Sequence, residues 1–168
     1  MEKGSILITG TNGGLGSAIV SQILRSTELA TSLHGIYTVR RADTATNLSK
    51  VLQRASSQLH THDVVALDLS RLSSVREAAT DINHRVSKGI MPPIRAVVLN
   101  AAYMEWETHS FTTDGFDMSF QCNYLSQWLL TLLILQSMNK NGRIIIIGSS
   151  SHEYDDSSSS SCPIVFTN

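Results

Sequence analysis

The chain has 168 residues, of which 42% are hydrophobic and 16% are charged, and its formal net charge is −1. These values are typical of one folded domain and exclude an intrinsically disordered chain. The basic residues are scattered, which argues against a nucleic-acid partner, and the longest apolar run, residues 128–135, is too short to cross a membrane. No secretory signal opens the chain, so we expect a cytoplasmic protein.

Two features that could suggest a metal or redox site do not have the spacing that such sites need. Cys122 and Cys162 stand alone. His60 and His62 have no third ligand nearby in the sequence, and we expect them to be surface residues. No metal is therefore expected.

A glycine-rich turn lies at residues 9–16, with the sequence Thr-Gly-Thr-Asn-Gly-Gly-Leu-Gly, directly after the apolar run 6–8 and before a helical pattern. Between a strand and a helix, backbone N–H groups and the positive end of the helix dipole favour a bound phosphate. Gly10 would allow the tight turn, Gly14 the approach of a pyrophosphate, and Gly16 close packing of the helix on the strand. The candidate cofactor-binding residues of the turn are Gly10, Thr11, Asn12, Gly14, Leu15 and Gly16.

Apolar runs and helical patterns alternate as far as residue 148. Strands are predicted at residues 5–9, 35–39, 64–67, 96–99 and 143–147, and helices at 14–29, 44–57, 73–86 and 113–139. This alternation predicts an α/β fold, a doubly wound, Rossmann-like parallel sheet with strand order 3-2-1-4-5. The unbroken isoleucine run at 144–147 predicts a last strand that is covered on both faces.

The composition changes after residue 150, where five consecutive serines follow two aspartates. We therefore expect one dinucleotide-binding domain over residues 1–150 and a Ser-rich C-terminal tail over residues 151–168.

Ligands of doubly wound folds bind at the carboxyl ends of the strands, so the residues at these ends are candidates for the site. Arg40 follows the second strand, where a basic residue suits the 2′-phosphate of NADP(H) and an acid would suit NAD(H). Asp68 follows the third strand and could accept a bond from an adenine amino group or cap a helix. Small residues at 100–102 would let a cofactor lie close to the backbone, and Ser149 offers a hydroxyl to a substrate carbonyl. We expect NADP(H), with NAD(H) less favoured.

Taken together and in this order, the segments between residues 5 and 152 resemble the short-chain dehydrogenase/reductase family, particularly its retinol-dehydrogenase-like members. The resemblance rests on the T-G-x-x-x-G-x-G turn and on Asp68, Leu69, Asn100, Ala101, Ala102, Asn123 and Ser149. The resemblance implies that Asn123 and Ser149 belong to the catalytic set. It also implies that five residues bind the cofactor: Asp68, Leu69, Asn100, Ala101 and Ala102. Asn123 would support a water chain to a catalytic lysine, or would only satisfy a backbone group of its helix.

The chain departs from the family at the catalytic Y-x-x-x-K motif. The fourth residue after Tyr154, where the motif requires a lysine, is Ser158, and Lys140 is the last lysine of the sequence. In the family this tyrosine transfers a proton and the lysine lowers its pKa, and such catalysis is worth about 10²–10⁴-fold in rate. We expect the fold to lack the family's C-terminal strands and substrate lobe. His152 and Tyr154 are considered as substitute acids or bases.

Three functions are compatible with this pattern. The first is a truncated NADP(H)-dependent oxidoreductase that acts on a carbonyl or alcohol of a small organic substrate. The second is a non-redox enzyme, such as a dehydratase, isomerase or cyclase, and the third is a catalytically silent nucleotide-binding protein.

The helix predicted at residues 113–139 carries an apolar stripe, and more apolar residues surround it. An exposed stripe of this kind predicts a homodimer or a higher homo-oligomer. The stripe consists of Tyr124, Trp128, Leu129, Leu132, Leu135 and Gln136.

Overall fold

The computed structural model describes residues 3–54, 60–106 and 108–149. Within these ranges the strands are β1 (Gly4–Ile8), β2 (Leu33–Val39), β3 (His62–Ala66), β4 (Ile94–Leu99) and β5 (Met138–Ile146). All neighbouring pairs are parallel. The order is β3-β2-β1-β4-β5, which confirms the predicted Rossmann-like fold.

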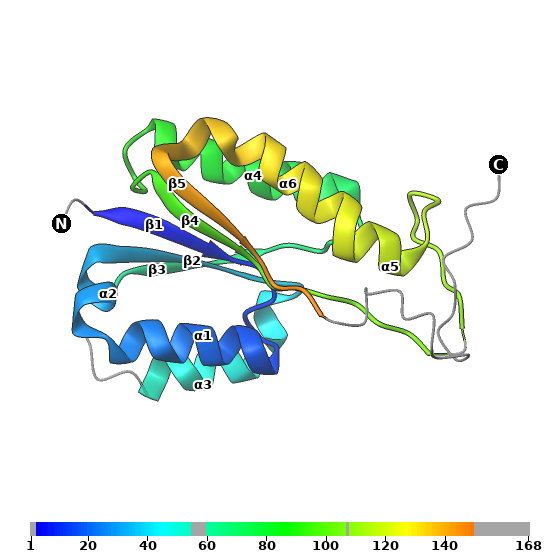
Figure 1. Cartoon of the computed structure of the whole chain (residues 1–168), viewed down its shortest axis with the longest axis horizontal. Helices are drawn as coiled ribbons and strands as arrows, with labels where there is room; N and C mark the ends of the chain where they lie inside the picture. The colour runs from blue at the N-terminus through cyan, green and yellow to red at the C-terminus, as the bar shows by residue number, and fades with distance from the viewer. Residues whose placement is uncertain (1–2, 55–59, 107, 150–168) are drawn as a thin grey trace.

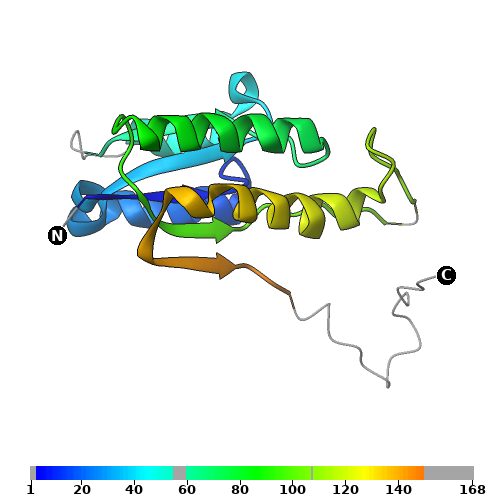
Figure 2. The same ribbon diagram turned by 90° about the horizontal axis from the view of Figure 1, so that it is seen from above.

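Helices cover both faces of the sheet (Figure 1). On one face lie α1 (Gly14–Arg25), α2 (Thr27–Ser32) and α3 (Thr46–Arg54). On the other face α4 (Leu72–Ser87) and α6 (Ser126–Ile134) lie side by side, as the view from above shows (Figure 2). A hydrophobic core lies on each face of the sheet. The central strand β1 contributes side chains to both cores, because successive side chains of a strand point to opposite faces.

Each core is built from a few large, fully buried side chains. Leu7 packs with Ile82 and Leu130 beneath α4 and α6, whereas Ile8 packs with Val20 beneath α1. Burial of one such side chain contributes about 1.5–3 kcal/mol.

The register brings the carboxyl ends of three strands to one edge of the sheet. Ile8, the last residue of β1, pairs with Tyr37 of β2 on one side and with Val98 of β4 on the other. Thr9, Arg40 and Asn100 therefore follow their strands at the same edge.

Two helices on the α1 side differ from their predicted bounds. The helix predicted over residues 14–29 ends at Arg25, because Ser26 is extended and its side chain accepts a bond from the Leu29 N–H to begin α2. The helix predicted over residues 44–57 begins at Thr46, and its predicted end falls outside the described residues. In contrast, α4 lies within one residue of the prediction.

The helix predicted over residues 113–139 is shorter and irregular. It begins with α5 (Met118–Phe120), continues through a π-helical turn (Gln121–Leu125) into α6, and ends in a 3₁₀ turn (Leu135–Ser137). Gly115 has a φ of 85°, which a helix does not allow. The Asp117 carboxylate then caps the new helix by accepting a bond from the Phe120 N–H at 2.8 Å.

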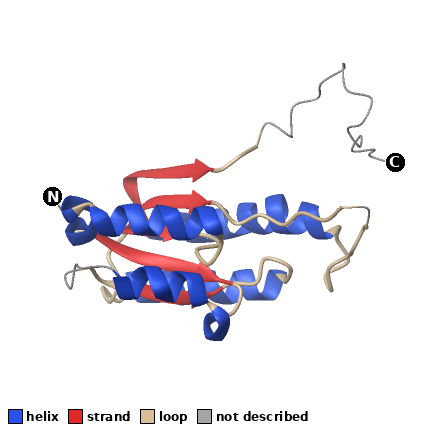
Figure 3. Cartoon of the chain, turned by 90° about the horizontal axis from the view of Figure 1, so that it is seen from below, coloured by secondary structure: helices blue, strands red, loops and turns tan. Residues whose placement is uncertain are grey.

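The expectation that the last strand is covered on both faces is wrong. β5 lies at the edge of the described sheet, beside the helical layers (Figures 2 and 3). Each of the four isoleucines at 144–147 is at least 40% exposed, and Ile146 is 73% exposed. An apolar run can indicate a parallel strand, but it cannot tell whether other elements cover that strand. The Ser-rich tail predicted over residues 151–168 falls outside the described residues.

Candidate functional site

The glycine turn between β1 and α1 borders open space at the carboxyl edge of the sheet. A Cβ atom added to Gly14, the first residue of α1, would meet no atom within 4 Å. The N-cap of α1, Gly13, provides no side-chain cap, so the first N–H groups of the helix remain available to a ligand. This combination of space, N–H groups and helix dipole suits an anion such as a pyrophosphate.

The other two glycines of the motif make close contacts with the protein itself. Gly10 has a φ of 70°, and a Cβ atom there would lie 2.9 Å from the Cα of Ala101. A Cβ atom on Gly16 would overlap the carbonyl oxygen of Gly10 and would lie 2.9 Å from Nδ2 of Asn100. Gly10 and Gly16 therefore let the turn, α1 and the end of β4 pack together, while Gly14 leaves room.

The side chains of Thr11 and Asn12 anchor the turn to neighbouring elements. Thr11 Oγ1 donates to the carbonyl oxygen of Thr38 in β2 at 3.0 Å. Asn12 Oδ1 accepts bonds from the N–H groups of Asn47, at 2.9 Å, and Leu48, at 3.3 Å, at the start of α3. These side chains support the turn, whereas the Leu15 side chain is exposed.

Thr9 ties the end of β1 to the end of β4. Its Oγ1 atom accepts bonds from the N–H groups of Asn100 and Ala101, both at 2.9 Å. The Asn100 side chain returns a bond from Nδ2 to the carbonyl oxygen of Thr9 at 2.8 Å. The backbone at Asn100, Ala101 and Ala102 is thereby held beside the glycine turn.

Gln127 of α6 completes this arrangement. Its Nε2 atom donates to the carbonyl oxygen of Ala101 at 2.7 Å, and its Oε1 atom accepts a bond from Thr9 Oγ1 at 3.3 Å. Gln127 could not be selected from the sequence, because a glutamine on an apolar helix carries no motif. It is buried within the described structure, and a buried polar side chain needs such partners.

The two arginines after β2 differ in their partners. Arg41 forms two bonds with the Asp43 carboxylate, from NH2 at 2.9 Å and from Nε at 3.3 Å, and the hydrogen bond from Arg41 lowers the pKa of Asp43. Arg40 is exposed and forms no ion pair with any described residue. Asp43 is thus engaged by Arg41, and Arg40 is the cation available at this strand end.

Asp68 adopts a local turn instead of capping α4. Its Oδ1 atom accepts bonds from Ser70, from N at 3.0 Å and from Oγ at 2.6 Å. The cap of α4 comes from Asp114, whose Oδ2 atom accepts a bond from the Leu72 N–H at 2.8 Å. This bond and one from Gln121 lower the pKa of Asp114.

Leu69 is held in place through its carbonyl oxygen. Gln121 Nε2 donates to this oxygen at 3.3 Å and Ser126 Oγ donates at 2.6 Å. Both donors belong to the irregular helical segment that begins at Met118. The loop after β3 is therefore fixed against that segment.

Asn123 lies in the π-helical turn and binds the backbone of the loop after β4. Its Oδ1 atom accepts a bond from the Tyr103 N–H at 2.6 Å, and its Nδ2 atom donates to the Tyr103 carbonyl oxygen at 2.8 Å. Both amide atoms serve this backbone clamp, which favours the structural alternative for Asn123. Ser149 is exposed and lies beyond the end of β5; the considered substitutes His152 and Tyr154 fall outside the described residues.

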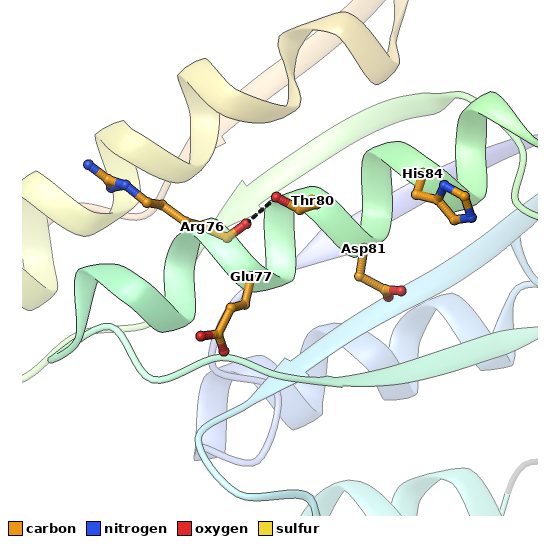
Figure 4. A pocket seen from close by; sticks show the side chains of 5 residues that line it. All are labelled: Arg76, Glu77, Thr80, Asp81 and His84. Atoms are coloured by element: carbon orange, nitrogen blue, oxygen red, sulfur yellow. Dashed lines mark hydrogen bonds between the residues drawn. The ribbon is translucent and has the colours of Figure 1, made fainter.

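A separate shallow hollow lies on the outer surface of α4 (Figure 4). All five lining residues come from this one helix: Arg76, Glu77, Thr80, Asp81 and His84. The Thr80 hydroxyl donates to the carbonyl oxygen of Arg76 at 2.7 Å, so part of the polar surface is satisfied within the helix. The hollow contains no residue of the carboxyl-edge site.

The described residues contain no group of three or more His, Cys, Asp or Glu side chains that could hold a metal ion. None of the helices in the described ranges is long and apolar enough to cross a membrane.

Comparison with known proteins gives a consistent result. The chain is 57% identical over 157 residues to the short-chain dehydrogenase iccH of Talaromyces variabilis, a match that covers 91% of this chain. Among solved structures, the fold is similar to a blue fluorescent protein from a metagenomic library in complex with NADPH, with a TM-score of 0.66 and 22% identity over 89% of this chain and 57% of that chain. It is also similar to an NADPH-bound carbonyl reductase from chicken fatty liver, with a TM-score of 0.60 and 19% identity over 82% of this chain and 49% of that chain.

The chain spans less than half the length of iccH, because the matched region is 42% of that protein. The family model for short chain dehydrogenases matches residues 5–160. The matched region contains β1 from its second residue onward, the glycine turn and all the strand ends described above. The chain therefore belongs to the short-chain dehydrogenase family.

Proposed function

We propose that the chain forms the nucleotide-binding part of an NADP(H)-dependent oxidoreductase that acts on a carbonyl or alcohol of a small organic substrate. The observation that carries the proposal is the open space at Gly14, bordered by the start of α1 at the carboxyl edge of the sheet. A pyrophosphate needs this space and these N–H groups. The NADPH complexes of two proteins with a similar fold support the choice of cofactor.

Arg40 supports a preference for NADP(H) over NAD(H). A guanidinium forms strong, charge-assisted bonds with a phosphate, and Arg40 is free of ion pairs within the described ranges. An acid that could bind the ribose hydroxyls of NAD(H) stands nearby, at Asp43, but its carboxylate is engaged by Arg41. We infer that the 2′-phosphate lies against Arg40.

The backbone at Ala101 would border the nicotinamide end of the cofactor. Thr9 and Gln127 hold this segment at the carboxyl edge, and the small side chain of Ala101 lets a flat ring approach the backbone. When bound, NADP(H) supplies or accepts the hydride. Ser149 would bind the substrate oxygen through its hydroxyl, and Asn123 would keep the Tyr103 loop in place.

The proton donor of this reaction is not evident in the 168 residues, which contain no Tyr-x-x-x-Lys sequence. We propose that an acid outside this set, from another subunit or another part of the protein, serves the reaction. The same observation favours a second candidate, a nucleotide-binding protein without catalysis of its own.

We also propose that the chain forms a homodimer or a higher homo-oligomer. The side chains of Tyr124 and Trp128 are 60% and 53% exposed, and Leu132 and Leu135 continue the same apolar ridge. Phe120 extends it, with its ring 5.6 Å from the ring of Tyr124. No charged residue occurs between residues 118 and 139, and a second copy of the same ridge would cover this surface.

Titration of the purified chain with NADPH and, separately, with NADH tests the proposed function. Calorimetry should give a lower Kd for NADPH than for NADH. Equal affinity for the two would overturn the preference, and no binding of either would overturn the proposal. The cytoplasmic location stays a prediction.

A further inference from the structure

A cluster of aromatic side chains lies where the amino end of β3 pairs with β2, with the ring of Tyr37 folded back over Gly35. It consists of Tyr37 from β2 and two histidines, His60 and His62, from the segment that enters β3. The three rings stack, with centroids 5.8–5.9 Å apart and interplanar angles of 10–28°. We call these three residues the Tyr–His stack.

The strand pairing makes room for this stack. Gly35 of β2 pairs with His62 of β3, and the ring of Tyr37 folds back over Gly35. A Cβ atom on Gly35 would overlap that ring. The absence of a side chain at Gly35 therefore lets Tyr37, which is fully buried, lie against both imidazoles.

The hydrogen bonds of His60 determine which of its nitrogens carries a proton. Nδ1 lies 3.1 Å from the carbonyl oxygen of Ala30 in α2, which can only accept, so Nδ1 carries the hydrogen. Nε2 lies 2.9 Å from the hydroxyl of Tyr37. In neutral His60 this nitrogen accepts a hydrogen bond from the Tyr37 hydroxyl, and every polar atom of the contact is satisfied.

A second proton on His60 would disturb this contact. Nε2 would then also donate, the Tyr37 oxygen would have to accept, and no described residue other than His60 bonds to the buried Tyr37 hydroxyl. Burial lowers the pKa of His60, the hydrogen bond to the Ala30 carbonyl opposes part of this shift, and the neighbouring His62 and His34 lower the pKa further. Burial also lowers the pKa of His62.

The charged groups near the stack lie mainly on the other face of the β2–β3 pair. Asp63 accepts bonds from Nε2 of His34 at 2.8 Å and from Arg85 of α4 at 2.7 Å. Arg85 also lies 3.7 Å from Asp81, which Figure 4 shows on the outer surface of α4. Asp63 favours a charge on His62 and His34 opposes it, so Asp63 offsets only part of the cost of protonating the stack.

We propose that the Tyr–His stack is an acid-sensitive latch, closed while both imidazoles are neutral, that joins α2 and the amino end of β3 to Tyr37 of β2. Protonation breaks the satisfied contact between Tyr37 and His60 and places like charges on two rings that are 5.8 Å apart. The latch opens in acid: His60, still bonded to the Ala30 carbonyl of α2, then separates from Tyr37 of β2.

The direction of the pH effect follows from the two pKa shifts. In the unfolded chain both histidines titrate near their ordinary value, about 6.5, whereas in the folded chain they titrate lower. Between these values the unfolded chain binds more protons, so stability falls as the pH falls. The contribution is fully present above about pH 7.5 and is lost as the pH drops through 6.5 towards the folded-state values.

Proton NMR of the histidine rings tests the latch in the wild-type chain. The ring signals of His60 and His62 should titrate below the ordinary value for histidine, about 6.5. Hydrogen exchange, corrected for intrinsic rate, should accelerate in β3 between about pH 7.5 and about pH 5.5. Titration of His60 at or above about pH 6.5 would overturn the proposal.

Urea unfolding of variants provides the second test. The wild-type midpoint should fall between about pH 7.5 and about pH 5.5, and the double variant His60→Gln/His62→Gln should lose more than half of this fall. The matched control His109→Gln, which alters an exposed histidine outside the stack, should keep most of it. A double variant that keeps the full wild-type fall would contradict the latch, and if this variant does not fold, the ring titration of the wild-type chain decides.

Discussion

The Nε2 atom of Gln127 donates a 2.7 Å hydrogen bond to the carbonyl oxygen of Ala101, which joins α6 to the backbone after β4. The same side chain accepts a bond from Thr9, the residue after β1. A single buried glutamine thus links α6 to the residues that follow β1 and β4, beside the glycine turn. The position of the backbone beside the proposed cofactor site depends on this link.

Replacement of Gln127 by leucine should therefore destabilise the chain. The Ala101 carbonyl would lose its partner, and an unsatisfied buried polar group costs about 1–3 kcal/mol. Urea unfolding measures the loss. The control is Gln136→Leu, because Gln136 is exposed and forms only a 3.4 Å bond within its own turn, so its effect should be close to zero. Equal stability of the two variants would show that the Gln127 link contributes little.

Arg40→Ala should weaken NADPH binding by about 1.5–3 kcal/mol, which is roughly a 10- to 150-fold rise in Kd, and should leave NADH binding nearly unchanged. The loss arises from the charge-assisted bonds to the 2′-phosphate. Arg41→Ala is the matched control, since its guanidinium is bound to Asp43, and it should cost less. If Arg40→Ala weakens the binding of both cofactors equally, Arg40 does not bind the 2′-phosphate.

Strand order and the position of the glycine turn could be predicted from the sequence, because both depend on local patterns. Apolar runs between helical patterns require parallel strands with crossover connections, and the turn at Gly10–Gly16 contains its own conformational signals. The exact start of α3 could not be predicted. It is capped by Asn12, more than thirty residues earlier in the chain, and only the folded structure brings the two together.

Only part of the candidate site could be predicted, because some of its contacts join residues that are far apart in the sequence. Asn123 could be selected from a motif, but its clamp on Tyr103 depends on a π-helical turn that no spacing rule indicated. Gln127 carries no motif at all. The exposure of Ile146 could not be predicted either, since an apolar strand has the same sequence pattern at the edge of a sheet as in its middle.

The 168-residue chain should show little or no reduction of simple aldehydes and ketones with NADPH. It contains no Tyr-x-x-x-Lys pair, and general acid–base catalysis contributes about 10²–10⁴-fold to such a rate. An assay of NADPH consumption over a panel of carbonyl compounds measures this. Robust turnover that survives both Ser149→Ala and Tyr154→Phe would show that an acid elsewhere in the chain performs the reaction.

Trp128→Glu should convert the proposed oligomer into a monomer or make the protein insoluble. A carboxylate in the centre of the apolar ridge cannot be buried against a second copy without a large desolvation cost. Sedimentation at micromolar concentration measures the change. The control Ile90→Glu alters a residue that is 66% exposed outside the ridge, and it should leave the oligomer intact. A wild-type chain that sediments as a monomer would contradict the proposed interface.

The location of the phosphate site is the central claim, and Gly14→Val tests it most directly. Because a Cβ atom at Gly14 meets nothing within 4 Å, this variant should keep the circular dichroism spectrum and the unfolding midpoint of the wild type. Gly16→Ala, which places a Cβ atom against the Gly10 carbonyl, should lower stability by about 1–3 kcal/mol. In a calorimetric titration with NADPH, we predict binding by the wild-type chain and none by the folded Gly14→Val variant. Wild-type affinity in that variant would contradict the site.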